Sequence, residues 1–349
     1  MTGQSCVSDA EIRALYTNRP CPQEIVMNAE ISCSDSQPSL ITSDQNDGIA
    51  LEQDYLEKQI VLKKSIIMDC PDTHVLTKLI WEPAVYFDYR KHNLTPTAKN
   101  SLDQNIRILF QFSKLFVAIR GFTDNRGNHA YNQSLASRRA ITTLNYLQKQ
   151  GIRNKRMIIA PVGETAPLLP NQTEENMAIN RRVEMLLLDM TGEPVPYVIL
   201  TKELRSLFQR KMDKQTFCKV WKKRVLWYPG IFFHADQHGL RSDIELKKLE
   251  ANIGVLKAYP EFMISVREFS SNDAHANRAM ERIQYIASDL YRNKIDNKRI
   301  QIVPPEETLV FKKQLTLETT RPCVEMLLLD HRARPFSVIV NLDRKTLFQ

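Results

Sequence analysis

The heptapeptide Val-Glu-Met-Leu-Leu-Leu-Asp occurs twice in this chain, at Val183–Asp189 and again at Val324–Asp330. The two copies begin 141 residues apart (324 − 183), which is the length of a domain and far longer than the period of a solenoid repeat. The chain has 349 residues, too many for one ordinary hydrophobic core. The repeated segment therefore predicts that the chain carries one domain twice.

The similarity between the two halves extends to both sides of the heptapeptide. Matching segments follow in the same order: Ile80–Phe87 with Leu226–Phe233, Arg120–Thr123 with Arg267–Ser270, Ile152–Arg156 with Ile295–Arg299, and Pro194–Phe208 with Pro335–Phe348. We expect three parts: an irregular N-terminal arm at 1–75, a first domain at 76–208 and a second domain at 209–349. Each domain includes the extension that follows its heptapeptide.

Apolar periodicity in the first half predicts alternating strands and helices. Thr95-Pro96 supplies an N-cap and an N1 proline for a first helix. A second helix is expected from His129 to Gln150, ended by Gly151. The apolar face of the first helix is expected to comprise Leu102, Ile106, Leu109 and Phe110. The expected strands are Ala84–Tyr89, Leu115–Arg120, Met157–Val162 and Arg182–Leu188.

This pattern predicts the α/β class, as an α+β sandwich. We expect two tandem domains, each with two main helices packed on a mixed four-stranded sheet. The composition provides enough apolar material for such cores, because 43% of the residues are hydrophobic. No run of eighteen apolar residues occurs, so we expect no transmembrane segment.

The net charge and the positions of the cysteines indicate which classes of partner and which cellular compartment are expected. The net charge of +8 suits an anionic partner or solubility alone, and the scattered basic residues disfavour nucleic acid. Four of the six cysteines, Cys6, Cys21, Cys33 and Cys70, lie in a polar N-terminal segment. They indicate disulfides in an oxidising compartment, with free thiols as the alternative. No signal peptide is visible, so either the chain is cytoplasmic or the sequence is a mature or trimmed form.

A polar loop and the segments after it carry an ordered signature. It comprises Gly121-Phe122-Thr123-Asp124-Asn125-Arg126-Gly127, Tyr131-Asn132, Arg138-Arg139-Ala140, Gly163-Glu164 and Asn180-Arg181-Arg182-Val183. From Ala84 to Asp189 this series resembles the OmpA-like domain, the peptidoglycan-binding module of bacterial envelope proteins. The resemblance implies a domain without catalytic activity or cofactor that grips the diaminopimelate residue of the peptidoglycan stem peptide.

The same resemblance implies which residues bind the ligand. Asp124 and Arg139 fall on the family's binding positions, with Asn180 and Arg181 at the rim; Thr123 and Gly121 complete the loop. Diaminopimelate presents an ammonium and a carboxylate on one carbon. Asp124 could accept from the ammonium and Arg139 could hold the carboxylate in a bidentate fork, which lysine could not reproduce. The alternative is an ion pair between Asp124 and Arg139 that pins the loop to the helix.

The second half departs from this signature at its polar positions. Alignment of the two halves puts Ser271 in place of Asp124 and Glu268 in place of Gly121, while Arg282 can be aligned with Arg139. Arg321-Pro322-Cys323 replaces Asn180-Arg181-Arg182. The second domain is therefore expected to keep the fold, to have lost diaminopimelate binding, and to serve as a scaffold or partner surface.

Taken together, these features favour a non-catalytic anchor in the periplasm, associated with the outer membrane or cell wall. Its partners would be peptidoglycan and other proteins of an envelope-spanning assembly such as a secretion system, outer-membrane lipoproteins among them. The alternative is a purely structural subunit of such a complex, without peptidoglycan binding. A wall-modifying enzyme is disfavoured, because the sequence has no Gly-x-Ser-x-Gly, no phosphate loop and no histidine pair at metal-binding spacing.

Overall fold

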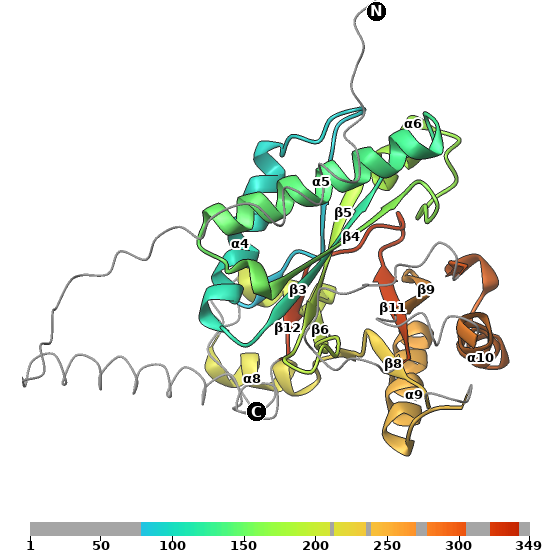
Figure 1. Cartoon of the computed structure of the whole chain (residues 1–349). Helices are drawn as coiled ribbons and strands as arrows, with labels where there is room; N and C mark the ends of the chain where they lie inside the picture. The colour runs from blue at the N-terminus through green and yellow to red at the C-terminus, as the bar shows by residue number, and fades with distance from the viewer. Residues whose placement is uncertain (1–77, 210–212, 235–238, 270–277, 305–321, 342–349) are drawn as a thin grey trace, which may run out of the picture. The chain divides into compact units, whose positions relative to one another are not determined.

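The computed structural model describes residues 78–209, 213–234, 239–269, 278–304 and 322–341 (Figure 1). All of them belong to one unit of the chain, Ile60–Gln349. The expected N-terminal arm at 1–75, with Cys6, Cys21, Cys33 and Cys70, lies outside the described residues. Among the described residues, no helix is both long and apolar enough to cross a membrane.

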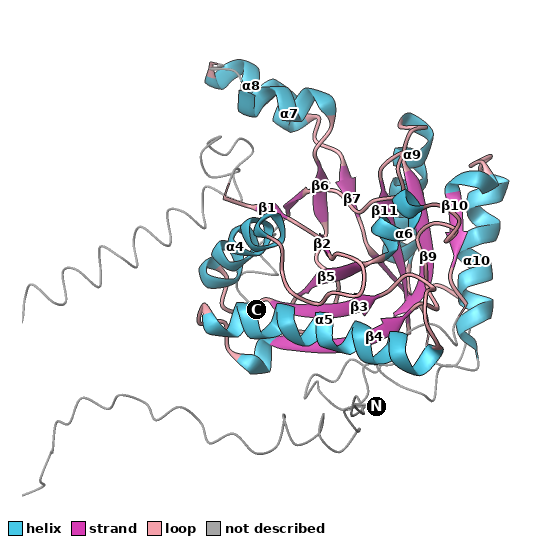
Figure 2. Ribbon diagram, turned by 90° about the horizontal axis from the view of Figure 1, so that it is seen from above, coloured by secondary structure: helices cyan, strands magenta, loops and turns pink. Residues whose placement is uncertain are grey.

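The first half forms a mixed four-stranded sheet, as the sequence predicts. Its strands lie in the order β2 (Ala84–Tyr86), β5 (Arg182–Leu188), β3 (Phe116–Phe122) and β4 (Met157–Gly163). β3 and β4 are parallel, and the other neighbours are antiparallel. Helices α4 (Pro96–Gln111) and α5 (His129–Lys149) accompany this sheet, and α5 runs along β3 and β4 (Figure 2).

The helix ends follow from local chemistry. The Thr95 side chain accepts a hydrogen bond from the Ala98 amide, and Pro96 occupies the first turn of α4, as predicted. Gly151 follows the end of α5 with a φ of 97°, a conformation that glycine adopts without a steric penalty. One prediction was wrong: Phe110 is 56% exposed, because it lies at the end of α4 beside Gly151, while Ile108 is buried instead.

The second half forms another mixed sheet with the same order of strands. The strands are β8 (Gly230–Phe232), β11 (Cys323–Leu329), β9 (Met263–Phe269) and β10 (Ile300–Ile302), accompanied by α9 (Asp243–Ala258) and α10 (Ala279–Arg292). β9 and β10 are parallel and the other neighbours antiparallel, as in the first half. The strand orders are therefore equivalent. β5 lies between β2 and β3 in the first half, and β11 lies between β8 and β9 in the second, while β4 and β10 are at the edges.

Equivalent side chains make equivalent hydrogen bonds in the two halves. The Nε1 atom of Trp81 donates to the Met185 carbonyl at 3.1 Å, and that of Trp227 donates to the Met326 carbonyl at 2.8 Å. After each long helix a 3-10 turn, η1 (Asn154–Arg156) or η3 (Asn297–Arg299), ends in an arginine whose guanidinium donates to three backbone carbonyls. The two halves thus share construction details beyond strand order.

A third sheet combines strands from both halves. Its order is β1 (Ile80–Trp81), β12 (Val338–Val340), β6 (Tyr197–Ile199) and β7 (Leu226–Trp227), all antiparallel. The strand that opens the first half thus pairs with the strand that closes the second, and the strand that opens the second pairs with the extension of the first. Along the chain, helices α7 (Lys202–Gln209) and α8 (Lys214–Lys222) connect β6 to β7. The two extensions therefore join the halves.

The first two sheets also contact each other directly. Ala118, Ile158, Ala160, Leu186 and Leu188 of the first sheet form one apolar cluster with Phe232 and Cys323 of the second. Every residue of β5 and of β11 is consequently buried, although side chains alternate between the two faces of a strand. Both faces of each closing strand are covered, which explains why five of the seven residues of the repeated heptapeptide are apolar.

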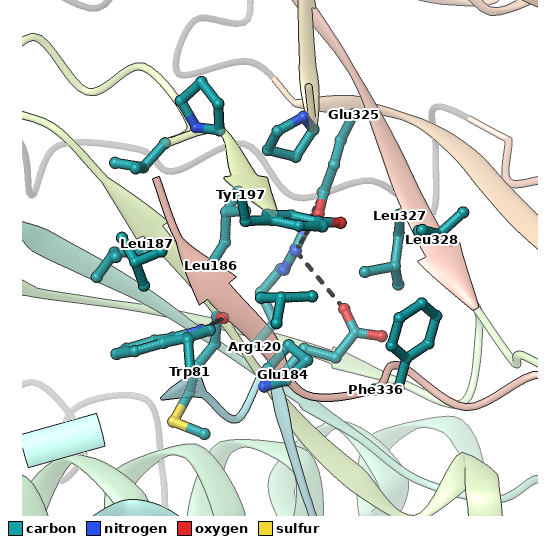
Figure 3. A pocket seen from close by; sticks show the side chains of 17 residues that line it. Trp81, Arg120, Glu184, Leu186, Leu187, Tyr197, Glu325, Leu327, Leu328 and Phe336 are labelled. Atoms are coloured by element: carbon teal, nitrogen blue, oxygen red, sulfur yellow. Dashed lines mark hydrogen bonds and ion pairs between the residues drawn. The ribbon is translucent and has the colours of Figure 1, made fainter. Parts of the chain in front are cut away.

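Two arginines and two glutamates lie buried between these sheets. Arg267 donates to Glu184 at 2.5 Å and to Glu325 at 3.0 Å, and Arg120 donates to Glu325 at 2.7 Å and lies 3.6 Å from Glu184. Figure 3 shows Arg120 between the two carboxylates, beside a cavity of about 40 Å³. Burial alone would raise the pKa of Glu325, but the two guanidiniums lower it to about 2. The glutamate of each heptapeptide copy is therefore an ionised partner between the halves.

Candidate functional site

The loop that carries the signature lies between β3 and α5. The Asn128 side chain caps α5 by accepting from the Tyr131 amide, and Gly127 has a φ of 114°. Gly121 lies inside β3, where an added Cβ would meet the Ala136 carbonyl oxygen at 2.1 Å. The structure thus gives Gly121 a packing role, because only glycine lets β3 approach α5 so closely.

Asp124 lies at the centre of a group of arginines. Its side chain is only 5% exposed, and its Oδ2 atom accepts from Arg126 Nη2 at 2.6 Å and from Arg181 Nη1 at 3.0 Å. Arg126 adds its Nε atom to Oδ2 at 3.2 Å and its backbone amide to Oδ1 at 3.3 Å. Burial acts to raise the pKa of Asp124, but these hydrogen bonds outweigh it and lower the pKa below its usual value.

The same two arginines also bind an acid from another element. Glu174, the first residue of α6 (Glu174–Asn180), accepts from Arg126 Nη1 at 2.9 Å and from Arg181 Nη2 at 2.8 Å. The Arg126 guanidinium lies over the Tyr89 ring, 3.7 Å from its centroid. Asp124, Arg126, Glu174 and Arg181 therefore form a closed ring of alternating charges, with Asp124 buried and Glu174 facing solvent.

Arg139 is fully buried beneath this loop. Its guanidinium donates to the carbonyls of Lys91, Phe122 and Asp88 at 2.9, 2.8 and 3.1 Å. Burial lowers the pKa of Arg139 to about 10, and the nearby Asp124 charge acts in the opposite direction. Among the described residues no ion pair joins Asp124 to Arg139, so the alternative of a pinning ion pair between them was wrong.

Two further polar side chains of this region are buried without hydrogen-bond partners among the described residues. They are the Thr123 hydroxyl and the Asn132 amide, each of whose residues is 1% exposed. An unpaired buried polar group costs about 1–3 kcal/mol, so such groups require an explanation. A polar ligand at this loop would provide partners for both.

The comparisons with known proteins identify this part of the chain. The sequence of residues 86–181 matches the OmpA family. Residues 86–181 form an OmpA-family domain.

Two relatives show the extent of the match. A peptidoglycan-associated lipoprotein of Pseudomonas aeruginosa is 35% identical over 100 residues, which are 29% of this chain and 59% of that protein. Outer membrane protein A of Bordetella avium is 33% identical over 108 residues, or 31% of this chain and 56% of that protein. The chain therefore spans little more than half the length of these relatives.

A solved structure is also similar to part of the chain. It is the crystal structure of the peptidoglycan-associated lipoprotein from Burkholderia pseudomallei, which is 26% identical and aligns with a TM-score of 0.30. The alignment covers 30% of this chain and 90% of that structure.

Within the OmpA-family domain, the expected site residues have different environments. Asp124 and Arg181 are brought together, and Thr123 and Arg139 lie beside the same loop. Asn180 is engaged elsewhere: its amide accepts from the amides of Leu168 and Leu169 and donates to the Leu169 carbonyl. These bonds hold the loop before α6, which is a structural task. The assignment of all these residues as ligands stays a prediction.

Sequence reasoning did not include Arg126, Glu174 or Asn132 among the site residues. Arg126 and Asn132 belong to the signature itself, so their place in the motif was an available signal. Glu174 lies 48 residues from its partner Arg126, and only the fold brings the two together. No group of three or more side chains suited to a metal ion occurs in the described part of the chain.

In the second half, an ion pair between Glu268 and Arg282 lies at the position equivalent to Gly121 and Arg139. The strand registers match Gly121, opposite Val183, with Glu268, opposite Val324. Arg139 and Arg282 each lie ten residues before the end of their helices (149 − 139 and 292 − 282), and both are fully buried. Arg282 Nη2 donates to Glu268 Oε1 at 2.6 Å, so a carboxylate of the protein itself occupies the second arginine.

Proposed function

We propose that the OmpA-family domain anchors the protein to peptidoglycan by binding the diaminopimelate residue of stem peptides. The observation that carries this proposal is the ionised, buried Asp124 beside unpartnered polar groups of Thr123 and Asn132. The relatives named as peptidoglycan-associated lipoproteins and outer membrane protein A support the ligand class. Asp124 would accept from the ligand ammonium.

Arg139 would hold the ligand carboxylate. A guanidinium has five N–H donors, and the described contacts of Arg139 use one on each of its three nitrogens. One N–H on each terminal nitrogen is therefore left for a carboxylate, which could accept both in a fork. Arg181 would serve as a fixed partner that keeps Asp124 ionised, and Asn180 as the support of the neighbouring loop.

The proposal assigns different roles to two copies of one fold: the copy at 76–208 binds the ligand, and the copy at 209–349 does not. The equal strand order and the matched hydrogen bonds of Trp81 and Trp227 support the duplication. In the second copy, the Glu268 carboxylate stands against Arg282, where the ligand carboxylate would otherwise bind. The second copy therefore acts as a scaffold or partner surface.

In the cell, the protein would be a non-catalytic periplasmic component of the envelope, associated with the wall or outer membrane. An accessory subunit of an envelope-spanning assembly, such as a secretion system, fits two joined domains of which one binds the wall. One observation favours a purely structural subunit instead: Asp124 is already saturated by Arg126 and Arg181. Binding to the wall therefore decides between the two functions.

Pull-down on purified peptidoglycan sacculi tests this directly. The wild-type chain should be retained, and Asp124→Ala and Arg139→Ala should each weaken retention about tenfold or more, because charge-assisted hydrogen bonds contribute about 1.5–3 kcal/mol each. Arg138→Ala is the matched control, since this substitution removes the same charge from α5, and the Arg138 guanidinium donates to the Ser134 hydroxyl on its own helix. Equal retention of all four proteins would contradict the proposal.

A further inference from the structure

The Asp124 carboxylate is not vacant in the free protein. Arg126 approaches it with three donors: its backbone amide, Nε and Nη2, the last at 2.6 Å. A ligand ammonium is also a cation that must reach Asp124 as a hydrogen-bond donor. The Arg126 guanidinium therefore occupies the position that the proposed ligand requires.

Arg126 and Arg181 both bind Asp124, but they are held differently. The Arg181 side chain is 8% exposed, and its Nε atom donates to the Phe87 carbonyl at 3.1 Å. The Arg126 side chain is 31% exposed, and beyond Asp124 it is held by the Glu174 carboxylate and the Tyr89 ring. Glu174 and Tyr89 are themselves exposed. Arg181 is thus part of the core, whereas Arg126 can turn out into solvent without breaking a backbone contact of its side chain.

We propose that Arg126 is an internal competitor that closes the diaminopimelate site until the ligand ammonium displaces it. This inference rests on the proposed peptidoglycan binding and deepens it. The exchange conserves charge at Asp124, because one cation replaces another. It also gives the buried carboxylate a second cationic partner beside Arg181 when no ligand is present, and these hydrogen bonds offset the desolvation of the charge. Tyr89 and Glu174 set how tightly the competitor is held.

The proposal predicts that one variant, Arg126→Ala, has a higher affinity for the ligand than the wild type. Removal of a charged side chain from a binding site normally weakens binding, but Arg126→Ala should strengthen it, because the ligand ammonium no longer competes with the guanidinium for Asp124. Arg126 makes two ion pairs, and each one that includes a partly exposed side chain contributes modestly, so we expect binding tighter by a factor on the order of ten or less. Glu174→Gln should shift affinity in the same direction by a smaller factor, since it loosens Arg126 and leaves Asp124 intact.

Titration calorimetry on the full chain with a diaminopimelate-containing stem peptide provides the test. The proteins are wild type, Arg126→Ala, Arg126→Lys, Glu174→Gln and Asp124→Ala, with Arg138→Ala as the control for loss of one positive charge on the same domain. A stem peptide with lysine in place of diaminopimelate controls for the carboxylate. We expect Arg126→Ala to bind more tightly than wild type, Arg126→Lys to lie between them, and Arg138→Ala to match wild type.

The outcomes separate this inference from the function on which it rests. If Asp124→Ala loses binding while Arg126→Ala binds more weakly than wild type or equally well, Arg126 is not a competitor, although the peptidoglycan function stands. If wild type and Asp124→Ala bind the peptide equally well, or neither binds it, the proposed function itself fails and the competitor with it. A second measurement is the side-chain Nε–H signal of Arg126 in NMR, which should lose its protection from exchange when the peptide is added.

Discussion

The two halves of this chain each bury an arginine beneath the loop end of a sheet, but they satisfy it differently. In the first half Arg139 binds backbone carbonyls and retains two donors, while the nearby acid, Asp124, is covered by a rim side chain. In the second half Glu268 reaches Arg282 from inside the sheet. A rim side chain can move aside, whereas a buried strand residue cannot. Closure by Arg126 is therefore reversible, and closure by Glu268 is permanent.

The largest expected effect concerns the buried ion cluster of Arg120, Glu184, Arg267 and Glu325, to which both halves contribute. Glu184→Gln removes one of two acids that face Arg120 and Arg267, and breaking a buried ion cluster costs about 3–5 kcal/mol. Glu325→Gln should lower the free energy of unfolding by a similar amount, because it faces the same arginines. Urea denaturation measures both, with the exposed Glu175→Gln as control. Much smaller losses for either variant would show that the halves do not depend on this cluster.

A pH effect should distinguish the second half from the first. Burial raises the pKa of Glu268 to about 7, despite its bonds with Arg282. The folded protein therefore holds this proton more tightly than the unfolded chain, so the stability contributed is present at low pH and is lost as the pH rises from about 4.5 to 7. The loss is on the order of 3 kcal/mol.

Glu268→Gln should remove this component, because glutamine does not titrate. The difference in unfolding free energy between variant and wild type, measured from pH 4.5 to 7.5, should therefore change in favour of the variant. A constant difference across this range would contradict permanent closure by a buried, titrating Glu268. Asp124 should show the opposite sign, since its pKa is lowered and its contribution is lost as the pH falls.

A third prediction contrasts the two arginines. Arg139→Ala should weaken binding of the stem peptide by about 1.5–3 kcal/mol, because a charge-assisted fork is lost. Arg282→Ala should leave binding unchanged and should instead lower stability, since Glu268 would lose its partner. Calorimetry and thermal melting on both variants separate the effects. A loss of binding in Arg282→Ala would show that the second half contains a working site.

The smallest expected effect concerns the close approach of β3 to α5 at Gly121. Gly121→Ala places a methyl group 2.1 Å from the Ala136 carbonyl oxygen, so β3 and α5 must separate. Overpacking of this kind typically costs about 1–3 kcal/mol of stability. The second half tolerates Glu268 at the same register position, so the reverse change, Glu268→Gly, should not impose such a clash. Paired denaturation curves of the two variants measure this difference.

The sequence predicted those parts of the fold that local patterns control. The bounds of β5 were predicted correctly, and the cap at Thr95 and the stop at Gly151 were found because their residue types have specific backbone preferences. The third sheet could not be predicted, because β1 and β12 have two and three residues and thus no measurable periodicity. Arg120 and Glu184 are charged residues within mostly apolar strands, and the strand sequences alone do not show that a second sheet covers them.

The candidate site shows the same limit. The resemblance located Asp124 and Arg139, and the structure surrounds both with the loop that the motif describes. Motif spacing could not show that Arg126 covers Asp124, since its second anchor, Glu174, comes from a helix 48 residues away. Nor could it show that Glu268 turns toward Arg282, because that contact depends on how closely β9 approaches α10.

The most direct test of the central claim is the stoichiometry of stem-peptide binding to the full chain. Titration calorimetry should give one site per chain, lost in Asp124→Ala and unaffected by Arg282→Ala. Two equivalent sites, or a single site that survives Asp124→Ala, would contradict the assignment of ligand binding to the first half alone.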